Sequence, residues 1–136
     1  MAEQSPAGGV TAHIRINDGR GQDAVKFYAA AFGGEEQFRH LADDGKRLMH
    51  AHLKINGGSL MLHDHFPEFV GDAPVSPPDG VVLHLEVDDA DTWWKRALDA
   101  GATVTFPLDN QFWGARYGQV KDPFGHTWSI GGPIPG

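Results

Sequence analysis

The nine residues VTAHIRIND, at positions 10–18, return in altered form as VVLHLEVDD at positions 81–89. Both segments carry a histidine in fourth place and an aspartate in ninth place, and apolar and polar residues alternate after the histidine. Alternation of this kind is typical of a β-strand that buries one face. The repeat therefore predicts two modules of the same fold, each of which begins with a strand.

A helix is expected after each repeat, because the apolar residues that follow return at helical spacing. These residues are Val25, Tyr28, Ala29 and Phe32 in the first module, and Trp94, Ala97 and Leu98 in the second. Asp91 is a candidate cap for the second helix. Gly33-Gly34 and Gly101 are expected to end the two helices.

Three strand candidates follow each helix, so each module reads βαβββ. The six segments are EEQFRHL (35–41), RLMHAHLKI (47–55), SLMLHD (59–64), TVTF (103–106), RYGQVK (116–121) and HTWSI (126–130). The predicted class is α+β, with the two modules forming a curved mixed sheet, helices over one face and a concave cavity on the other.

We expect a single domain at residues 10–136, made of a module at 10–65 and a module at 81–132. Residues 66–80 are rich in proline and glycine and are interpreted as a linker. Residues 1–9 are interpreted as a flexible N-terminal tail.

The strand pattern also predicts which side chains face the cavity. Successive side chains on a strand point to opposite faces. The apolar set of the two repeats is expected to pack under the helices: Ile14, Ile16, Leu83, Leu85 and Val87. His13, Arg15, His84 and Glu86 then face the concave side, and His13 and His84 occupy equivalent places in the repeat.

Composition narrows the classes of function. The 136 residues carry 11 Lys and Arg against 18 Asp and Glu, a formal charge of −7, and contain no cysteine. The basic residues are scattered, so we expect no nucleic-acid partner. The chain has no apolar run of membrane-spanning length and no secretory signal pattern, so we expect no membrane association and a cytoplasmic location.

Two further segments carry a family resemblance: AVKFYAAAFGG (24–34) and QFWGARYGQVKDPFGHTWSI (111–130). With the paired modules, they resemble the vicinal oxygen chelate superfamily, which includes glyoxalase I, extradiol dioxygenases, fosfomycin-resistance transferases and bleomycin-resistance proteins. The second segment is most similar to the PhnB-like branch. The resemblance implies a glyoxalase-like fold and a homodimer whose subunits help to build the pockets.

The resemblance also implies where a metal would bind, because metal-dependent members use two histidines and two glutamates on the first and last strands of each module. His13 matches the first ligand. The third falls on Val82 when counted from the motif, or on His84 when taken from the internal repeat. Met61 and Ser129 occupy the two glutamate positions, so we expect no metal. The alternative is a divalent metal in a rebuilt site at His13 and His84, with His63 nearby.

The remaining candidates describe a pocket for a small molecule. Aromatic walls with a few polar groups are typical of such pockets. The candidate ligand-binding residues are His13, His63, His84, Trp113, Arg116, Tyr117 and Ser129. Five of them also have a simpler interpretation. It is a polar contact for His13 and His84, a solvated strand end for His63 within His63-Asp64-His65, and surface packing or a dimer contact for Trp113 and Arg116.

The sequence thus favours a protein that binds a small organic molecule in a polar and aromatic cavity without the usual metal. Sequestration of the bleomycin-resistance kind and an unassigned activity both remain open, and no catalytic residue is assigned. The alternative is a metal-dependent lyase, isomerase or dioxygenase of the glyoxalase type with a rebuilt histidine-rich site.

Overall fold

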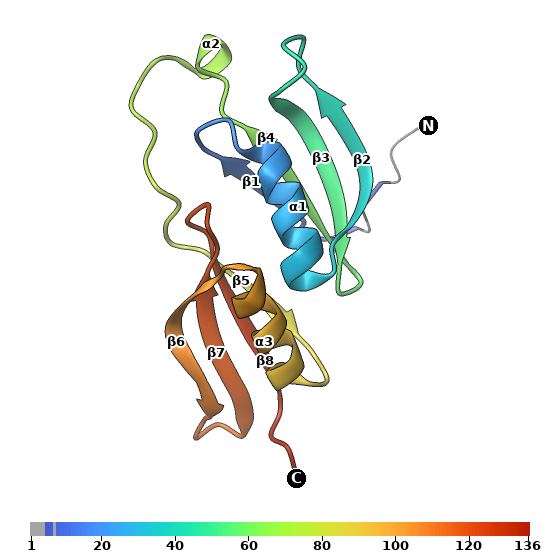
Figure 1. The fold of residues 1–136 in the computed structure, drawn as a ribbon, viewed down its shortest axis with the longest axis vertical. Helices are drawn as coiled ribbons and strands as arrows, with labels where there is room; N and C mark the ends of the chain where they lie inside the picture. Colours follow the sequence, from blue (N-terminus) through green and yellow to red (C-terminus); the bar gives the residue numbers. More distant parts are fainter. Residues whose placement is uncertain (1–4, 7) are drawn as a thin grey trace. The chain divides into compact units, whose positions relative to one another are not determined.

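The computed structural model describes residues 5–6 and 8–136, and the chain folds as the two predicted βαβββ modules (Figure 1). Five of the nine residues of the predicted tail, 1–4 and 7, lie outside the described residues. The contacts divide the chain into two units, the first ending at Ser76 and the second beginning at Pro77. Residues 30–32 are grouped with the second unit.

The first module forms a four-stranded sheet in the order β1-β4-β3-β2, in which β1 and β4 are parallel and the other pairs antiparallel. Its elements are β1 (Ala12–Ile16), α1 (Gly21–Phe32), β2 (Glu35–Leu41), β3 (Leu48–Ile55), β4 (Gly58–Asp64) and a short α2 (Pro67–Val70). The short helix lies inside the segment that the sequence indicates to be a linker. A proline at its first position suits a helix start, because proline lacks the N–H that would be left unbonded there.

The second module repeats the plan with the strand order β5-β8-β7-β6, and β5 and β8 are again parallel. Its elements are β5 (Val82–Glu86), α3 (Ala90–Ala100), β6 (Thr103–Asn110), β7 (Ala115–Lys121) and β8 (Thr127–Pro133). The α+β class with two βαβββ modules and mixed sheets is confirmed. Hydrogen bonding divides the eight strands into two sheets of four rather than one continuous sheet.

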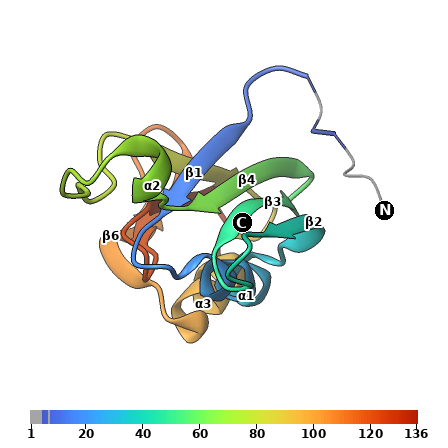
Figure 2. The ribbon, with the colours of Figure 1, turned by 90° about the horizontal axis from the view of Figure 1, so that it is seen from above.

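Each module buries one face of its sheet beneath its own helix, and Figure 2 shows this layering from a second direction. The first core contains Ile16, Ala24, Val25, Tyr28, Leu53 and Leu62, all buried. The second contains Leu85, Val87, Ala97, Val120, Trp128 and Ile130, also buried. Ile16, Leu85 and Val87 are therefore buried as the alternation predicts, whereas Ile14 is half-buried, and the opposite faces of the two sheets carry the polar side chains.

The helix boundaries follow ordinary capping chemistry, but the predicted N-cap of α3 was wrong. Gly33 adopts a left-handed φ of 68° and its N–H donates to the carbonyl of Ala29, which closes α1. At the start of α3 the cap is Asp89, whose carboxylate accepts from the N–H of Thr92 at 3.2 Å. The expected cap, Asp91, lies two residues later, in the first turn of the helix.

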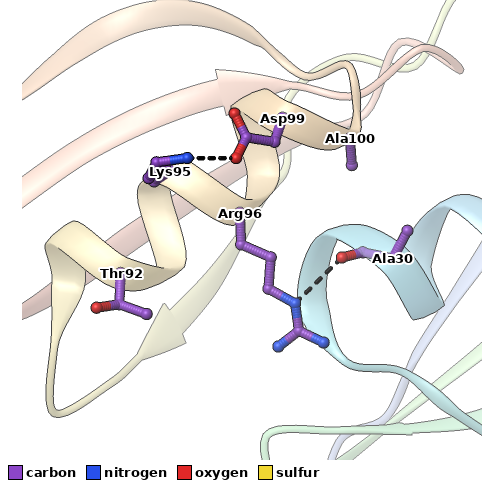
Figure 3. A pocket seen from close by; sticks show the side chains of 6 residues that line it. All are labelled: Ala30, Thr92, Lys95, Arg96, Asp99 and Ala100. Atoms are coloured by element: carbon purple, nitrogen blue, oxygen red, sulfur yellow. Dashed lines mark hydrogen bonds and ion pairs between the residues drawn. The ribbon is translucent and has the colours of Figure 1, made fainter.

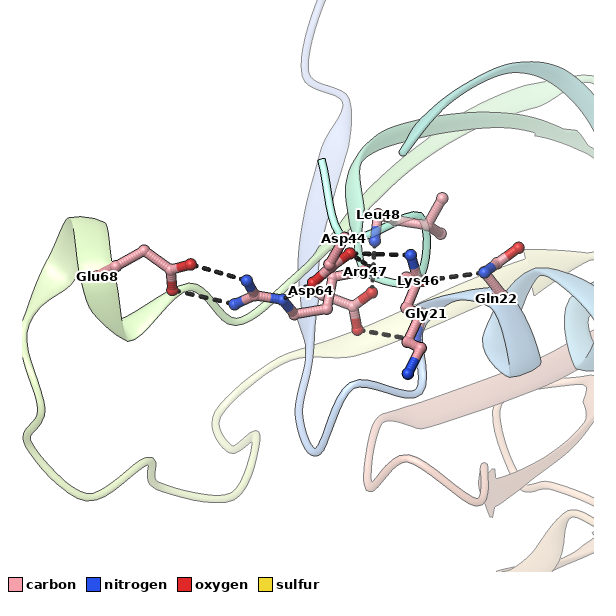
Figure 4. Close-up of polar contacts among 8 residues, drawn as sticks. All are labelled: Gly21, Gln22, Asp44, Lys46, Arg47, Leu48, Asp64 and Glu68. Atoms are coloured by element: carbon pink, nitrogen blue, oxygen red, sulfur yellow. Dashed lines mark hydrogen bonds and ion pairs between the residues drawn. The ribbon is translucent and has the colours of Figure 1, made fainter. Parts of the chain in front are cut away.

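A buried aspartate joins three segments of the first module (Figure 4). Asp64 is 0% exposed, and its two carboxylate oxygens accept the backbone N–H of Gly21 at 2.8 Å and of Leu48 at 2.7 Å. It thus ties the end of β4 to the start of α1 and to the start of β3. The sequence interpretation of a solvated strand end is wrong for Asp64. Gly21 is required at this contact, because a β-carbon there would collide with the carboxylate.

A second cluster, at the surface, holds the turn between β2 and β3 to α2 (Figure 4). The guanidinium of Arg47 donates two hydrogen bonds to Glu68, at 2.7 and 3.0 Å, and one to Asp44 at 2.8 Å. The same guanidinium lies 4.4 Å from the centre of the Phe66 ring. Hydrogen bonds from Arg47 lower the pKa of Glu68 and of Asp44 to about 2 each.

No helix among the described residues is long and apolar enough to cross a membrane.

We predict that Asp64→Asn lowers the free energy of unfolding by about 1–3 kcal/mol, since one buried N–H would lose its acceptor and face an amide N–H₂ instead. Urea unfolding followed by circular dichroism measures this loss. Asp43→Asn, at an exposed neighbour in the turn between β2 and β3, is the matched control and should change stability by less than about 0.5 kcal/mol. Equal unfolding midpoints for the two variants would contradict the role assigned to Asp64.

The Arg47 cluster predicts a pH-dependent contribution to stability. Folding lowers the pKa of Glu68 from 4.5, and of Asp44 from 3.8, to about 2. The contribution is therefore complete above about pH 4.5 and is lost as the pH falls toward about 2. Thermal unfolding of wild type and Arg47→Met is measured across this range. The difference between their melting temperatures should shrink as the pH falls.

Glu68→Gln is the control for the Arg47 experiment, because the neutral amide imitates the protonated acid and removes that group's share of the pH dependence. A difference between wild type and Arg47→Met that stays constant from pH 6 to pH 2 would show that the ring of Phe66, rather than the carboxylates, accounts for the effect of Arg47.

Candidate functional site

The pairing of the first and last strands of the second module sets the geometry of its open face. β5 and β8 run parallel with His84 directly opposite Ser129 and Val82 directly opposite Thr127. Because side chains alternate, Val82, His84 and Glu86 leave the sheet on the face away from the buried Leu85. The polar residues of the second repeat are therefore gathered on one face, as their spacing predicts.

That face is hollowed into a cavity of about 380 Å³, which we call the module-2 pocket. Its lining residues come from β5, from β7 and the turn before it, and from β8: Val82, His84, Glu86, Trp113, Ala115, Tyr117, Ser129 and Gly131. The structure thus brings together four of the seven candidate residues from the sequence: His84, Trp113, Tyr117 and Ser129.

A chain of hydrogen bonds runs along the polar side of the module-2 pocket. The hydroxyl of Ser129 lies 2.7 Å from Nδ1 of His84, and Nε2 of His84 lies 2.9 Å from Oε1 of Glu86. Ser129 is only 1% exposed, whereas the side chain of Glu86 is largely exposed. The chain therefore connects the floor of the pocket to its solvent-facing edge.

Aromatic rings form the other side of the pocket. The ring of Tyr117 stacks on that of His84, with 6.0 Å between centroids and 24° between planes. Trp113 meets Tyr117 edge-on at 5.6 Å, and remains 52% exposed. The hydroxyl of Tyr117 accepts a hydrogen bond from Nε2 of Gln119 at 2.9 Å. A half-exposed indole beside a fixed phenol ring is a surface on which a flat ligand can stack.

Gly131 is a pocket residue that sequence reasoning missed. A β-carbon at this position would lie 3.0 Å from Cε1 of His84 and 3.4 Å from Cδ2 of Tyr117. The absence of a side chain is what lets these two rings approach each other across β8. The signal that could have indicated it is the Gly131-Gly132 pair directly after the DPFGHTWSI motif, within β8.

Arg116, a candidate pocket residue in the sequence analysis, lies on the opposite face of β7. Its guanidinium donates two hydrogen bonds to Asp91 of α3, both at 2.9 Å, and one to Asn110 of β6 at 3.0 Å. The hydrogen bond to Asp91 raises the pKa of Arg116. The side chain fastens α3 to its sheet and is not among the residues that line the pocket.

The other two candidates, His13 and His63, belong to the first module and share the open face of its sheet. The ring of His13 makes edge contacts with His63 at 5.0 Å and with His50 at 5.8 Å between centroids. Nδ1 of His63 donates to the backbone carbonyl of Asp64 at 2.7 Å. Burial, followed by repulsion from His63 and His50, lowers the pKa of His13, so its imidazole favours the neutral form.

The register decides which residues correspond between the modules. His13 lies opposite Met61 in β1 and β4, as His84 lies opposite Ser129 in β5 and β8. His84, rather than Val82, is therefore the structural counterpart of His13. The strand positions across from both histidines carry a thioether and a hydroxyl in place of carboxylates.

This donor set does not fit the two-histidine, two-glutamate site that the resemblance implies. Within the described residues, no group of three or more His, Asp or Glu side chains is placed to hold a metal ion.

A second hollow, of about 430 Å³, lies beside α3 (Figure 3). It is the larger of the two, but its charged groups already have partners. Nζ of Lys95 pairs with Asp99 at 2.7 Å, and Nε of Arg96 donates to the carbonyl of Ala30 at 3.1 Å. No aromatic side chain is among its lining residues. The module-2 pocket is therefore the stronger candidate site.

Comparisons with known proteins agree with this architecture. An uncharacterised protein of Mycobacterium bovis is 44% identical over 126 residues, which cover 90% of this chain and 81% of the relative. A crystal structure of a Pseudomonas aeruginosa protein matches with a TM-score of 0.75 and 26% identity, covering 93% of this chain and 98% of that one.

A PhnB protein from Bacillus cereus matches with a TM-score of 0.72 at 19% identity, over 92% of this chain and 99% of that one, which shows the shared fold alone. The model of the Glyoxalase/Bleomycin resistance protein/Dioxygenase superfamily matches residues 11–130. The chain therefore belongs to the glyoxalase/bleomycin resistance protein/dioxygenase superfamily.

Proposed function

We propose that this protein binds a small organic molecule in the module-2 pocket and does so without a metal ion. The observation that carries the proposal is the pairing, in one cavity of about 380 Å³, of the hydrogen-bonded side chains Ser129, His84 and Glu86 with the rings of Tyr117 and Trp113.

The cavity suits a small and partly flat ligand. Its volume falls within the range of small-molecule sites, in which apolar walls supply most of the binding energy and a few polar groups fix orientation. Trp113 and Tyr117 offer an aromatic wall, and Ser129 and Glu86 offer oxygen atoms. The carboxylate of Glu86 and the formal charge of −7 favour a neutral or cationic ligand over an anionic one.

The proposed mode of action is sequestration of a small organic compound, of the kind that the bleomycin-resistance members of the superfamily perform, or a reaction not yet assigned. Three statements stay predictions from the sequence: that the chain belongs to the PhnB-like branch, that it forms a homodimer, and that it is cytoplasmic.

A compound screen read by thermal shift tests the proposal. A ligand present at 100 times its Kd stabilises the fold by about 2.7 kcal/mol, which such a screen detects. For the best compound, we expect Trp113→Ala to weaken binding at least about tenfold, because the stacking surface is lost. Isothermal titration calorimetry of wild type and variant measures the change.

Trp93→Ala is the matched control for Trp113→Ala, because Trp93 lies on α3 and is absent from the lining of the pocket. It should leave the affinity within about twofold of wild type. A compound whose affinity falls with Trp93→Ala but not with Trp113→Ala would place the binding site elsewhere. A broad screen without any hit would count against a binding function.

The second candidate function is a metal-dependent lyase, isomerase or dioxygenase of the glyoxalase type. The contact of the His13 ring with His63 and His50, and the lowered pKa of His13, favour it, since metals bind neutral imidazoles. Against it stand Met61 and Ser129 across from His13 and His84.

Elemental mass spectrometry on untagged protein, purified without chelator, decides between the two candidates. We predict far less than one transition-metal ion per chain. His13→Ala should have the same metal content as wild type, and treatment with chelator should leave the melting temperature unchanged. About one Zn, Ni, Mn or Fe per chain, removed by His13→Ala but retained by the control His126→Ala, would establish the metal-dependent candidate instead.

A further inference from the structure

The hydrogen-bond chain Glu86–His84–Ser129 has a direction that the chemistry of its members fixes. A carboxylate only accepts hydrogen bonds, so the 2.9 Å contact with Glu86 requires the hydrogen on Nε2 of His84. In the neutral imidazole, Nδ1 then carries a lone pair. The 2.7 Å contact at Nδ1 is therefore donated by the hydroxyl of Ser129.

The hydroxyl of Ser129 has a single hydrogen, and this arrangement directs it toward His84. What Ser129 offers to the module-2 pocket is then the lone pairs of Oγ. Ser129 is 1% exposed and lines the cavity, so little bulk water competes for these lone pairs. An acceptor held at the floor of a pocket favours a ligand group that can donate to it, and penalises a ligand acceptor placed against it.

We propose that Glu86 fixes the tautomer of His84, and that Ser129 consequently selects ligands that present an N–H or O–H donor to the floor of the pocket. This inference rests on the proposed binding function and specifies the ligand class for the same site. Ser129 is the group that touches the ligand, and Glu86 is a positioning residue that acts through His84.

The stacking of His84 on Tyr117 and the bare backbone of Gly131 support the inference, because they restrict the orientation of the imidazole. The ring lies 6.0 Å from that of Tyr117 at an interplanar angle of 24°, and its Cε1 edge faces Gly131. A ring held in this plane keeps Nδ1 toward Ser129 and Nε2 toward Glu86. Exchange of the two nitrogens would require the ring to turn over against Tyr117.

A pair of nearly isosteric neutral probes isolates the predicted preference. Indole carries an N–H donor where benzofuran carries an oxygen acceptor, and the two are otherwise alike in shape. At pH 8, where imidazoles are ordinarily neutral, we expect wild type to bind indole about tenfold more tightly than benzofuran. In Ser129→Ala this ratio should fall to about one.

Ser59→Ala is the control for the probe experiment, because Ser59 also lies beside a histidine, 3.0 Å from Nε2 of His52, but belongs to the first module and does not line the pocket. It should keep the wild-type ratio. Equal affinities for indole and benzofuran in wild type, or a preference for indole that persists in Ser129→Ala, would overturn the selection by Ser129.

Long-range ¹H–¹⁵N NMR of the histidine side chains tests the role of Glu86 without any ligand. Wild type at pH 8 should show His84 with its hydrogen on Nε2. In Glu86→Ala the form with hydrogen on Nδ1 should become detectable, and Glu86→Gln should restore the wild-type pattern because its amide carbonyl still accepts. A wild-type His84 with its hydrogen on Nδ1, or a tautomer unaffected by Glu86→Ala, would overturn the proposal.

The two readouts separate this inference from the function on which it rests. If neither probe binds, the broad screen gives no hit and His84 carries its hydrogen on Nε2, the binding function and the selection built on it fall, while the tautomer assignment stands. If both probes bind and depend on Trp113, but His84 carries its hydrogen on Nδ1, the binding function stands and the selection by Ser129 is overturned.

Discussion

The parallel pairing of the first and last strands of each module is the constraint on which the rest of the structure depends. It places β1 beside β4 and β5 beside β8, and it fixes which residues stand opposite each other. A slip by one residue would turn every side chain of a strand to the other face, burying His84 and exposing Leu85. The buried apolar residues under α1 and α3 hold the register, and the register in turn assembles the open faces.

The two modules use this common frame for different chemistry. In the first, the open face gathers His13, His50 and His63, and the position across from His13 is Met61. In the second, a serine stands across from the histidine and an aromatic wall stands beside it. The two modules therefore share strand order and buried faces, whereas the residues that can meet a ligand differ between them.

Much of the fold was predictable because it depends on local pattern. The repeat and its alternation predicted both modules, and helical spacing with terminal glycines predicted α1 and α3. The sequence located four of the pocket residues because strand alternation and the aromatic motif are local signals. The strands predicted from the sequence end too early for β6 and β8, because proline and glycine are not typical of strands. Pro107 lies within the irregular part of β6, and Gly131 and Gly132 lie within β8.

What could not be predicted depends on contacts between distant segments. Arg116 belongs to the aromatic motif but points to the helix, because Asp91 and Asn110 bind its guanidinium there. Asp64 looked like one member of a solvated HDH triplet, yet two backbone amides from other elements bind it in the core. Both outcomes depend on hydrogen-bonding partners from other elements, which no local pattern in the sequence indicates.

The most direct test of the central claim is a crystal structure of chelator-treated protein in complex with the tightest compound from the screen. We predict electron density for the compound against Trp113 and Tyr117, with a donor group at Oγ of Ser129 and no metal ion. Density at His13 and His63, density in the hollow beside α3, or a complex that forms only when a metal ion is restored would contradict it.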